Sequence, residues 1–334
     1  MRRESVTYFG MKIIIPTAGE GTRLRPHTLT QAKVLLNVAG KPILGHILDP
    51  LVRLKPEKVI FIVSSHREKI ANYVHQNYTF KTGFIQQKRP LGLGHAVSLA
   101  LGEIGQEPVL IILGDTIVEE SLFKKLDTKR DWLGVKPVKD PHRFGIAEAE
   151  NGFAKKLVEK PEHPRGNLAL VGLYYIKSTQ IFKQALEHII NHKITTRGEY
   201  QLTDALQLMI KTGVKFKTVE IKEWYDCGKV ETLLETNRRL LERNHNSVPK
   251  LKRALVLPPV YIARSASINN SVVGPNVTVL EQAIIDNSVV RNSILGEGSR
   301  VSGAVLDGSV IGQKARVTGQ MRSINLGDLS EIGV

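Results

Sequence analysis

Cysteine is almost absent from this chain of 334 residues, in which Cys227 is the only one. A single cysteine excludes a disulfide within the chain and any metal site built from several cysteines, and it suits a reducing compartment. No apolar run approaches the length that crosses a membrane, so we expect no membrane partner. Residues 1–10 lack the apolar core of a secretory signal. We therefore expect a cytoplasmic protein in which residues 1–10 form an extension ahead of Met11.

Acidic residues are scarce relative to basic ones, with 32 Asp and Glu against 47 Lys and Arg, a net charge of +15. From Ala254 onward the two kinds balance at six each, so the excess lies in the first 253 residues. The chain has no Lys/Arg-rich block of five to eight residues and no interleaved aromatic stripe. A phosphate-rich small substrate or a generally basic surface therefore explains the charge better than nucleic acid does.

A glycine-containing stretch near the start is the most informative part of the sequence. The β-branched run Ile13-Ile14-Ile15 leads into Gly19-Glu20-Gly21, which predicts a buried strand that ends in a tight loop. Backbone N–H groups in such a loop can approach a polyanion closely. A plain strand-to-helix turn with solvated basic neighbours is the alternative.

The loop matches neither of two familiar phosphate-binding patterns. A dinucleotide-binding loop needs a third glycine where this chain has Leu24, and Gly40-Lys41 is followed by Pro42 instead of the Ser or Thr of a P-loop. Arg23, Arg25 and Lys33 follow the loop instead. These cations suit a site that binds a triphosphate and stabilises charge during transfer.

Strands and helices alternate through the first 113 residues, which predicts an α/β fold with parallel strands. We expect ligands beyond the carboxyl ends of those strands, where both the glycine loop and Asp115 fall. The predicted elements are helices at 43–54, 68–76 and 92–103 and strands at 58–64, 84–87 and 109–113. After Trp132 strands become more frequent, and a long helix is expected from Val230 to about Asn244.

Beyond Val260 apolar residues recur every five or six positions, separated by small, Asn or Gly residues. A short repeat of strand and turn is typical of a parallel β-helix, because each coil must stack on the next to bury its apolar side. A β-sandwich, the alternative, would show longer alternating strands. We predict a first domain over residues 11–245, a proline-containing linker over 246–259 and a β-helix over 260–334.

Seven motifs, in this order, resemble those of the sugar-1-phosphate nucleotidylyltransferases, and the tail resembles that of the long form of glucose-1-phosphate thymidylyltransferase. They are the stretch 19–28 with Lys33, Gly92-Leu93-Gly94-His95-Ala96, Gly114-Asp115, Phe144-Gly145, Glu159-Lys160-Pro161, Gly198-Glu199 and Trp224-Tyr225-Asp226-Cys227-Gly228. The resemblance implies a Rossmann-like, mixed and mainly parallel sheet in a catalytic domain. It also implies a left-handed β-helix of hexapeptide-type repeats and a homo-oligomer.

The resemblance also implies a reaction. The oxygen of a sugar-1-phosphate, glucose-1-phosphate being favoured, attacks the α-phosphorus of a pyrimidine nucleoside triphosphate, dTTP being favoured, and pyrophosphate leaves. Positioning and charge neutralisation then account for catalysis. Its implied residues are Arg23 and Lys33 for catalysis, Gly19, Gly21, Thr22, Gln87 and Gly92 for the nucleotide, Gly145, Glu159 and Lys160 for the sugar phosphate, and Asp115 and Asp226 for Mg²⁺.

Some positions depart from the thymidylyltransferase pattern. Ala18 stands where glycine is usual, and Gln31-Ala32 replaces the residues usual before Lys33. A UTP-dependent glucose-1-phosphate uridylyltransferase therefore remains an alternative. A non-catalytic regulatory relative is a second, which the retained arginine, lysines and aspartates disfavour. An acyltransferase tail is a third, disfavoured because no histidine follows His245.

Overall fold

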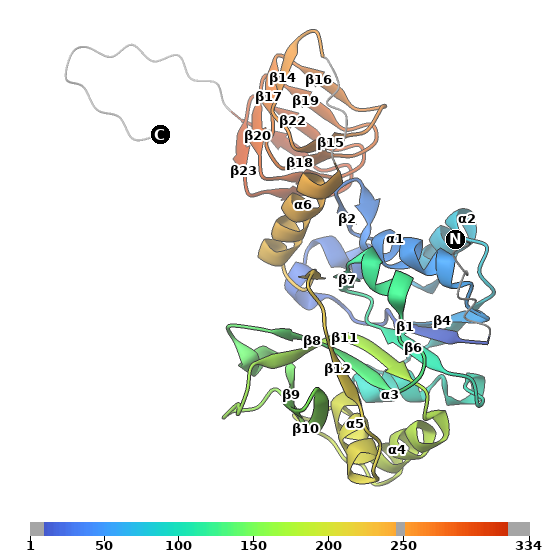
Figure 1. Ribbon diagram of the computed structural model, residues 1–334. Helices are drawn as coiled ribbons and strands as arrows, with labels where there is room; N and C mark the ends of the chain where they lie inside the picture. The colour runs from blue at the N-terminus through green and yellow to red at the C-terminus, as the bar shows by residue number, and fades with distance from the viewer. Residues whose placement is uncertain (1–9, 245–250, 320–334) are drawn as a thin grey trace, which may run out of the picture. The chain divides into compact units, whose positions relative to one another are not determined.

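The computed structural model describes residues 10–244 and 251–319 (Figure 1). The chain divides into two compact units, and each consists of two chain segments. Among the described residues the first unit contains 10–36 and Pro42–Lys229, and the second contains Asn37–Lys41 and the residues from Val230 onward. The predicted division into a catalytic domain, a linker and a β-helix domain stays a prediction, and residues 1–9, 245–250 and 320–334 lie outside the described part.

A nine-stranded sheet forms the centre of the first unit. In spatial order its strands are β5 (Thr82–Gln86), β4 (Lys58–Val63), β1 (Lys12–Pro16), β6 (Val109–Ile112), β11 (Leu168–Ile176), β8 (Trp132–Pro137), β12 (Lys217–Glu220), β10 (Phe153–Glu159) and β9 (Gly145–Glu150). The chain adds β4 and β5 on one side of β1 and then crosses to add β6 on the other. Ligands of open α/β sheets bind at such a switch point.

The sheet is mixed, as expected, but only the half from β5 to β6 is parallel throughout. In the other half most neighbouring strands are antiparallel, with β8 and β12 the parallel pair among the described strands. The prediction of a mainly parallel sheet therefore holds for the first half alone. A parallel partner needs a long crossover, whereas a strand such as β10 returns directly beside β9.

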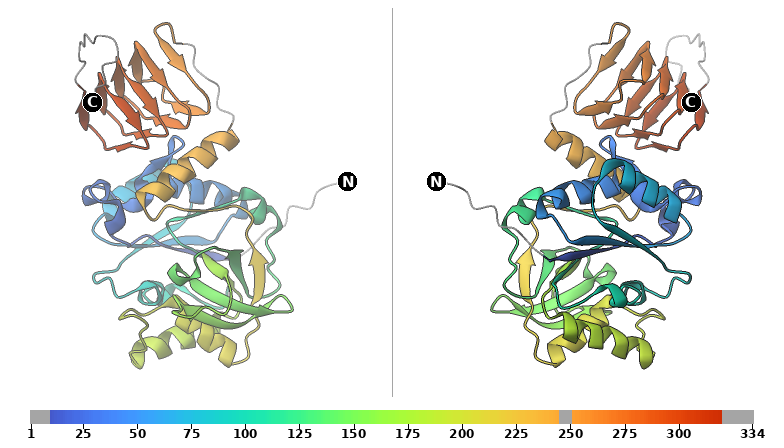
Figure 2. Two further views of the ribbon diagram at one scale, coloured as in Figure 1. Left: turned by 90° about the vertical axis from the view of Figure 1, so that its left-hand side faces the viewer. Right: turned by 90° about the vertical axis from the view of Figure 1, so that its right-hand side faces the viewer.

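Helices cover the sheet on both faces, and Figure 2 shows α3, α4 and α5 together on one of them. The α-helices of this unit are α1 (Ile43–Leu48), α2 (Arg67–Asn77), α3 (Leu93–Ser98), α4 (Thr179–Asn191) and α5 (Leu202–Lys211). Short 3₁₀ helices span Thr22–Leu24, His27–Leu29, Lys33–Leu35, Asp49–Leu54, Leu101–Glu103, Glu120–Lys125 and Pro141–Arg143. No helix in 10–244 or 251–319 is long and apolar enough to span a membrane.

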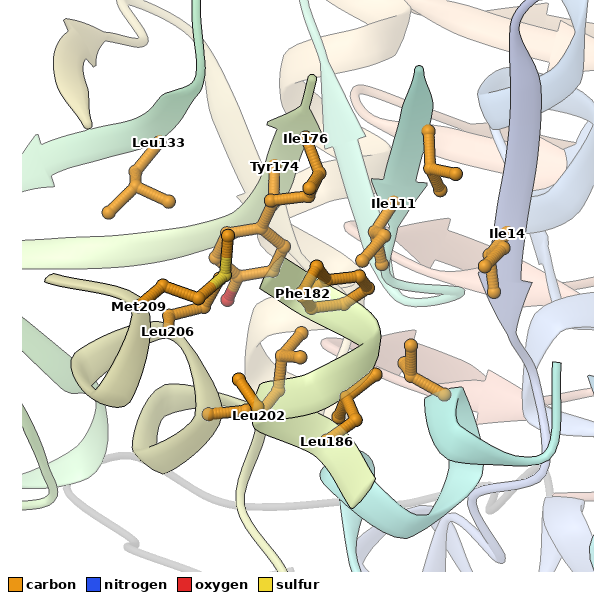
Figure 3. Packing of buried hydrophobic residues seen from close by; sticks show 14 of the residues in the cluster. Ile14, Ile111, Leu133, Tyr174, Ile176, Phe182, Leu186, Leu202, Leu206 and Met209 are labelled. Atoms are coloured by element: carbon orange, nitrogen blue, oxygen red, sulfur yellow. The ribbon is translucent and has the colours of Figure 1, made fainter. Parts of the chain in front are cut away.

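One hydrophobic core lies between the sheet and the helices α3, α4 and α5 (Figure 3). Ile14 and Ile111 point into it from the sheet, and Phe182, Leu202 and Leu206 meet them from α4 and α5. All five side chains are fully or almost fully buried. Each buried aromatic or aliphatic side chain of this size stabilises the fold by about 1.5–3 kcal/mol. This core therefore fixes the positions of the strands whose ends carry the site.

The second unit contains α6 (Val230–Asn244), β2 (Asn37–Val38) with the first residue of β3 (Lys41–Pro42), and three four-stranded parallel sheets. Their strands are β14 (Ala254–Val256), β17 (Ser271–Val273), β20 (Val289–Arg291) and β23 (Val305–Asp307); β15 (Val260–Ile262), β18 (Val277–Val279), β21 (Ile294–Leu295) and β24 (Val310–Ile311); and β16 (Ser267–Asn269), β19 (Ile284–Asp286), β22 (Arg300–Ser302) and β25 (Arg316–Thr318).

Successive strands of the second unit go to successive sheets, so the chain coils. Leu255 pairs with Val272 and Val289 with Val305, which gives coils of 17 or 16 residues. Val273, Val290, Leu295 and related apolar side chains fill the interior. This arrangement is consistent with the predicted parallel β-helix, since each coil buries its apolar side only against the next.

Candidate active site

The glycine loop leaves the carboxyl end of β1 and folds back over Lys33. Gly21 has a φ of +62°, and a Cβ there would lie 2.9 Å from Cγ2 of Thr28 and 3.2 Å from Cβ of Lys33. The hydroxyl of Thr28 donates to the carbonyl of Gly21 over 2.8 Å. A side chain at Gly21 would therefore push the loop away from Lys33. By contrast, a Cβ at Gly19 would meet nothing within 4 Å, so that part of the loop faces open space.

A cavity of about 520 Å³, here called the loop pocket, opens beside the glycine loop at the switch point of the sheet. It is lined by every residue predicted to bind the nucleotide, together with one predicted catalytic and one predicted metal residue. These are Gly19, Gly21, Thr22, Gln87, Gly92, Lys33 and Asp115. Residues from three loops, which follow the parallel strands β1, β5 and β6, thus meet in one place.

A second cavity of about 500 Å³, here called the lysine pocket, shares Asp115 with the loop pocket. It is lined by the remaining predicted site residues, which are Arg23, Gly145, Glu159, Lys160 and Asp226. The Nζ of Lys160 lies 3.6 Å from Oε1 of Glu159, and the hydroxyl of Thr203 donates to Oε2 of Glu159 over 2.7 Å. Glu159 is thus held from two sides, and the Lys160 beside it lines the cavity.

Antiparallel pairing of β7 (Thr116–Val118) with β13 (Trp224–Asp226) brings the two predicted metal aspartates together. Asp226 lies opposite Thr116, the neighbour of Asp115, and the backbone N–H of Cys227 donates to the carbonyl of Asp115 over 3.2 Å. Burial, and next the charge of Asp115, raise the pKa of Asp226 above its usual value. Asp115 and Asp226, which are 111 positions apart in the sequence, thus lie close enough to repel each other. Two carboxylates that share one cation would show the same repulsion when the cation is absent.

Three cations surround the aspartate pair. Lys33 Nζ lies 2.5 Å from Oδ2 of Asp115. Nη2 of Arg23 and Oδ1 of Asp226 both lie close to Gly228, at 3.1 and 2.8 Å from the position of an added Cβ. Lys33, Arg23 and Arg143 each lower the pKa of Asp226, in opposition to burial and Asp115. The site is therefore suited to receive further negative charge, such as phosphate.

Several polar residues of the lysine pocket were not predicted from the sequence, and three of them contact predicted site residues. Arg143 lies 4.0 Å from Asp226 through Nη2 and Oδ2, Arg197 donates through Nη2 to the carbonyl of Lys160 over 2.9 Å, and Thr203 contacts Glu159 as described. Arg143 and Arg197 each stand next to a motif, Phe144-Gly145 and Gly198-Glu199. That adjacency was the available signal, whereas nothing in the sequence near Thr203 indicated its contact.

The donor set at the aspartate pair fits a magnesium ion. Within the described ranges no group of three or more His, Cys, Asp or Glu side chains could hold a metal. Magnesium needs only one or two protein carboxylates when substrate phosphates and water complete its six oxygen ligands. Lys33 on Asp115 now supplies the positive charge that such an ion would bring.

Comparison with known proteins identifies the family. Residues 12–243 match the family model described as nucleotidyl transferase. The chain belongs to this nucleotidyl transferase family. The predicted family is thereby confirmed, and the match includes all of the site residues described above.

Relatives in the nucleotidyl transferase family extend across most of the chain. Glucose-1-phosphate thymidylyltransferase of Streptomyces antibioticus is 32% identical over 93% of this chain and 90% of its own, and that of Streptomyces griseus is 31% identical over 88% and 89%. The bifunctional protein GlmU of Methanocaldococcus jannaschii is 35% identical over 77% of this chain and 61% of its own.

Solved structures share the fold. A Bacillus anthracis structure with the provisional assignment glucose-1-phosphate thymidylyltransferase superposes with a TM-score of 0.62 at 26% identity, over 72% of this chain and 98% of its own. A UDP-glucose pyrophosphorylase superposes with a TM-score of 0.60 at 24% identity, over 70% of this chain and 100% of its own.

Proposed function

We propose that this protein transfers a nucleotidyl group from a pyrimidine nucleoside triphosphate, with dTTP favoured, to a sugar-1-phosphate, with glucose-1-phosphate favoured. The observation that carries the proposal is the junction of two pockets at Asp115. The loop pocket offers backbone N–H groups and Gln87 to a nucleotide, and the lysine pocket offers Lys160 and Glu159 to a sugar phosphate. Relatives with the name glucose-1-phosphate thymidylyltransferase over most of the chain support the choice of substrates.

In the proposed reaction an oxygen of the sugar-1-phosphate forms a bond to the α-phosphorus of the triphosphate. The bond from that phosphorus to the bridging oxygen breaks, and pyrophosphate leaves with the electron pair. Arg23 and Lys33 bind the triphosphate and stabilise the charge that develops on the leaving group. Lys160 fixes the attacking phosphate, while Glu159 and the backbone of Gly145 accept and donate hydrogen bonds to sugar hydroxyls.

Asp115 and Asp226 would hold a magnesium ion. When bound, the ion neutralises phosphate charge as a Lewis acid. Lys33 contacts Asp115 and lines the loop pocket, where its ammonium group would bind the triphosphate. Arg23 and Arg143 would hold the carboxylate of Asp226 in its ionised form.

A UTP-dependent glucose-1-phosphate uridylyltransferase is the second candidate function. Ala18, where thymidylyltransferases usually have glycine, lies in the loop pocket and favours this alternative. A non-catalytic regulatory role is disfavoured because Arg23, Lys33 and both aspartates converge on one site instead of being dispersed.

The remaining expectations complete the proposal. We infer that the coiled second unit is a left-handed β-helix of hexapeptide-type repeats, and that the protein is a cytoplasmic homo-oligomer. Coils of 16 or 17 residues are close to three repeats of five or six residues, which supports the repeat assignment.

A substrate matrix tests the function. Purified protein is incubated with Mg²⁺ and each of dTTP, UTP, CTP, GTP and ATP against glucose-, galactose-, mannose- and N-acetylglucosamine-1-phosphate, and pyrophosphate release is measured. We expect release with dTTP or UTP and glucose-1-phosphate. Absence of release in all combinations would overturn the proposed function, and a preference for purine nucleotides would overturn the pyrimidine assignment.

A further inference from the structure

The side chain of Gln87 is held in one orientation at the edge of the loop pocket. Its backbone N–H donates to the carbonyl of Val63 over 2.8 Å, and the residue is only 9% exposed. The amide nitrogen Nε2 lies 3.2 Å from the carbonyl oxygen of Gly92 and 3.0 Å from Nδ1 of His95. Both partners belong to the first turn of α3, since the N–H of Ala96 donates to the same Gly92 carbonyl.

Hydrogen-bond chemistry decides which way the Gln87 amide points. A carbonyl oxygen can only accept, so the amide atom that faces Gly92 must be the nitrogen. One N–H of Gln87 donates to Gly92 and the other to Nδ1 of His95. His95 must therefore be neutral, with its proton on Nε2.

With both N–H groups in use, the Gln87 amide has only its carbonyl oxygen left to offer. Among the residues that the structure describes, none donates to this oxygen. The residue lines the loop pocket, so the free acceptor is available to a nucleotide there.

We propose that His95 is a positioning residue that sets base selectivity by holding the Gln87 amide so that it presents an acceptor alone. The inference rests on the proposed function. With this oxygen opposite N3 of the base, uracil and thymine donate their N3 hydrogen to it, whereas N3 of cytosine is itself an acceptor and is repelled. Opposite position 4 the oxygen would instead accept from the amino group of cytosine, so the selectivity requires the placement at N3. The arrangement selects uracil and thymine against cytosine, and it does not distinguish uracil from thymine.

The surroundings of His95 keep it in the neutral form that this contact requires. Burial, and next the positive charge of Arg89 in the segment between β5 and α3, lower the pKa of His95. The ring of Tyr200 lies near the ring of His95, with 6.4 Å between their centroids. Gly92 fixes the start of α3, because its φ of +105° and a Cβ clash at 2.6 Å with the carbonyl of Tyr200 leave no room for a side chain.

Two substitutions of His95 test the proposal through selectivity. His95→Asn keeps an acceptor near the position of Nδ1, and His95→Phe keeps a ring but removes the acceptor. The measured quantity is kcat/KM for UTP divided by kcat/KM for CTP, with one sugar-1-phosphate. We expect His95→Asn to retain the wild-type ratio and His95→Phe to lower it by about tenfold or more, since the freed amide can turn and donate to cytosine.

Matched variants separate positioning from general damage. Ser98→Ala removes a 2.8 Å hydrogen bond to the carbonyl of His95 without touching Gln87, and it should leave the ratio unchanged. Gln87→Leu should lower the ratio. The double variant Gln87→Leu/His95→Phe should have the same ratio as Gln87→Leu alone, because His95 acts through Gln87. Equal ratios in wild type and folded His95→Phe would overturn the role of His95, whereas absence of activity with every nucleotide in wild type would overturn the proposed function itself.

A measurement on the wild-type protein remains decisive if His95→Phe does not fold. The ¹⁵N shifts of labelled histidine, assigned by loss of one signal in His95→Asn, report which ring nitrogen carries the proton. We expect His95 to be the Nε2–H tautomer near neutral pH. A proton on Nδ1 would overturn the proposal, because Nδ1 could then accept nothing from Gln87.

Discussion

Asp115 and Asp226 show how two residues concentrate charge where the two pockets meet. Burial and mutual repulsion raise the pKa of Asp226, while three cations act against that change. Such opposed effects are typical of functional positions, where charge is concentrated for a ligand.

Removing either carboxylate should abolish catalysis without unfolding the protein. We expect Asp115→Asn and Asp226→Asn each to lower Mg²⁺-dependent pyrophosphate release by about 100-fold or more. Asp140→Asn, at an exposed position of the same unit, is the control and should keep wild-type turnover. Thermal unfolding verifies that the variants are folded, and normal turnover in either aspartate variant would contradict the two-aspartate metal site.

His95 should make folding stability depend on pH. Because the folded state lowers its pKa, the fold favours the neutral ring. The stabilisation is present above the usual value near 6.5 and is lost as pH falls through 6.5 toward the lowered pKa. Urea unfolding between pH 7.5 and 5.5 should show a smaller loss in His95→Asn than in wild type. Arg89→Gln should also reduce the loss, and an equal loss in all three proteins would refute the linkage.

All twelve residues with predicted roles line the two pockets, because short motifs at strand ends lie at one edge of a sheet. Their roles stay predictions until variants are measured. Arg143 and Arg197 were signalled only by their places beside two motifs, and Thr203 by nothing, since the contacts of all three depend on how distant segments and α5 approach one another. The orientation of Gln87 likewise depends on a contact with α3 that spacing alone does not specify.

At the scale of elements, the start of α3 is the most constrained turn near the site. Gly92→Ala should destabilise the protein by about 1–3 kcal/mol, because alanine is strained at a φ of +105° and its Cβ would overlap the backbone of Tyr200. The control is Gly102→Ala, since a Cβ at Gly102 meets nothing within 4 Å. That substitution should change the free energy of unfolding by less than about 0.5 kcal/mol. Urea denaturation compares the two, and equal effects would contradict the constraint.

A helix could be predicted with its bounds where apolar residues recur at helical spacing over a long stretch without interruption. The helix expected from Val230 to about Asn244 is α6, with the same bounds. The helix expected at 43–54 is instead α1 followed by a 3₁₀ helix, Asp49–Leu54, because Pro50 has no N–H to donate to His46. The one expected at 92–103 likewise divides into α3 and Leu101–Glu103.

At the scale of the molecule, a short N-terminal segment belongs to the second unit. The N–H of Ala39 donates to Oδ1 of Asn237 over 2.8 Å, and Thr278 donates to the same oxygen over 2.7 Å. The Nδ2 of Asn237 donates to the carbonyl of Asn276 over 3.1 Å. Through these hydrogen bonds Asn237, which is 1% exposed, connects the N-terminal segment, α6 and the coils in one buried network.

Breaking this network should weaken the second unit. Asn237→Ala leaves three polar groups without their partner, and we expect a loss of about 2 kcal/mol or more in the free energy of unfolding. Arg238→Ala, the next residue of α6, removes only exposed ion pairs with Glu235 and Glu242. It should cost less than about 1 kcal/mol. Equal losses in denaturant titrations would argue against the network.

The place of Ala39 in the second unit has a consequence for synthesis on the ribosome. Ala39 and its partner Asn237 are 198 positions apart in the chain. At about 5–20 residues per second, the segment Asn37–Lys41 waits roughly 10–40 s for the helix that receives it. The first unit includes the chain from Pro42 to Lys229, so nearly all of that unit is synthesised while the segment still lacks its partner.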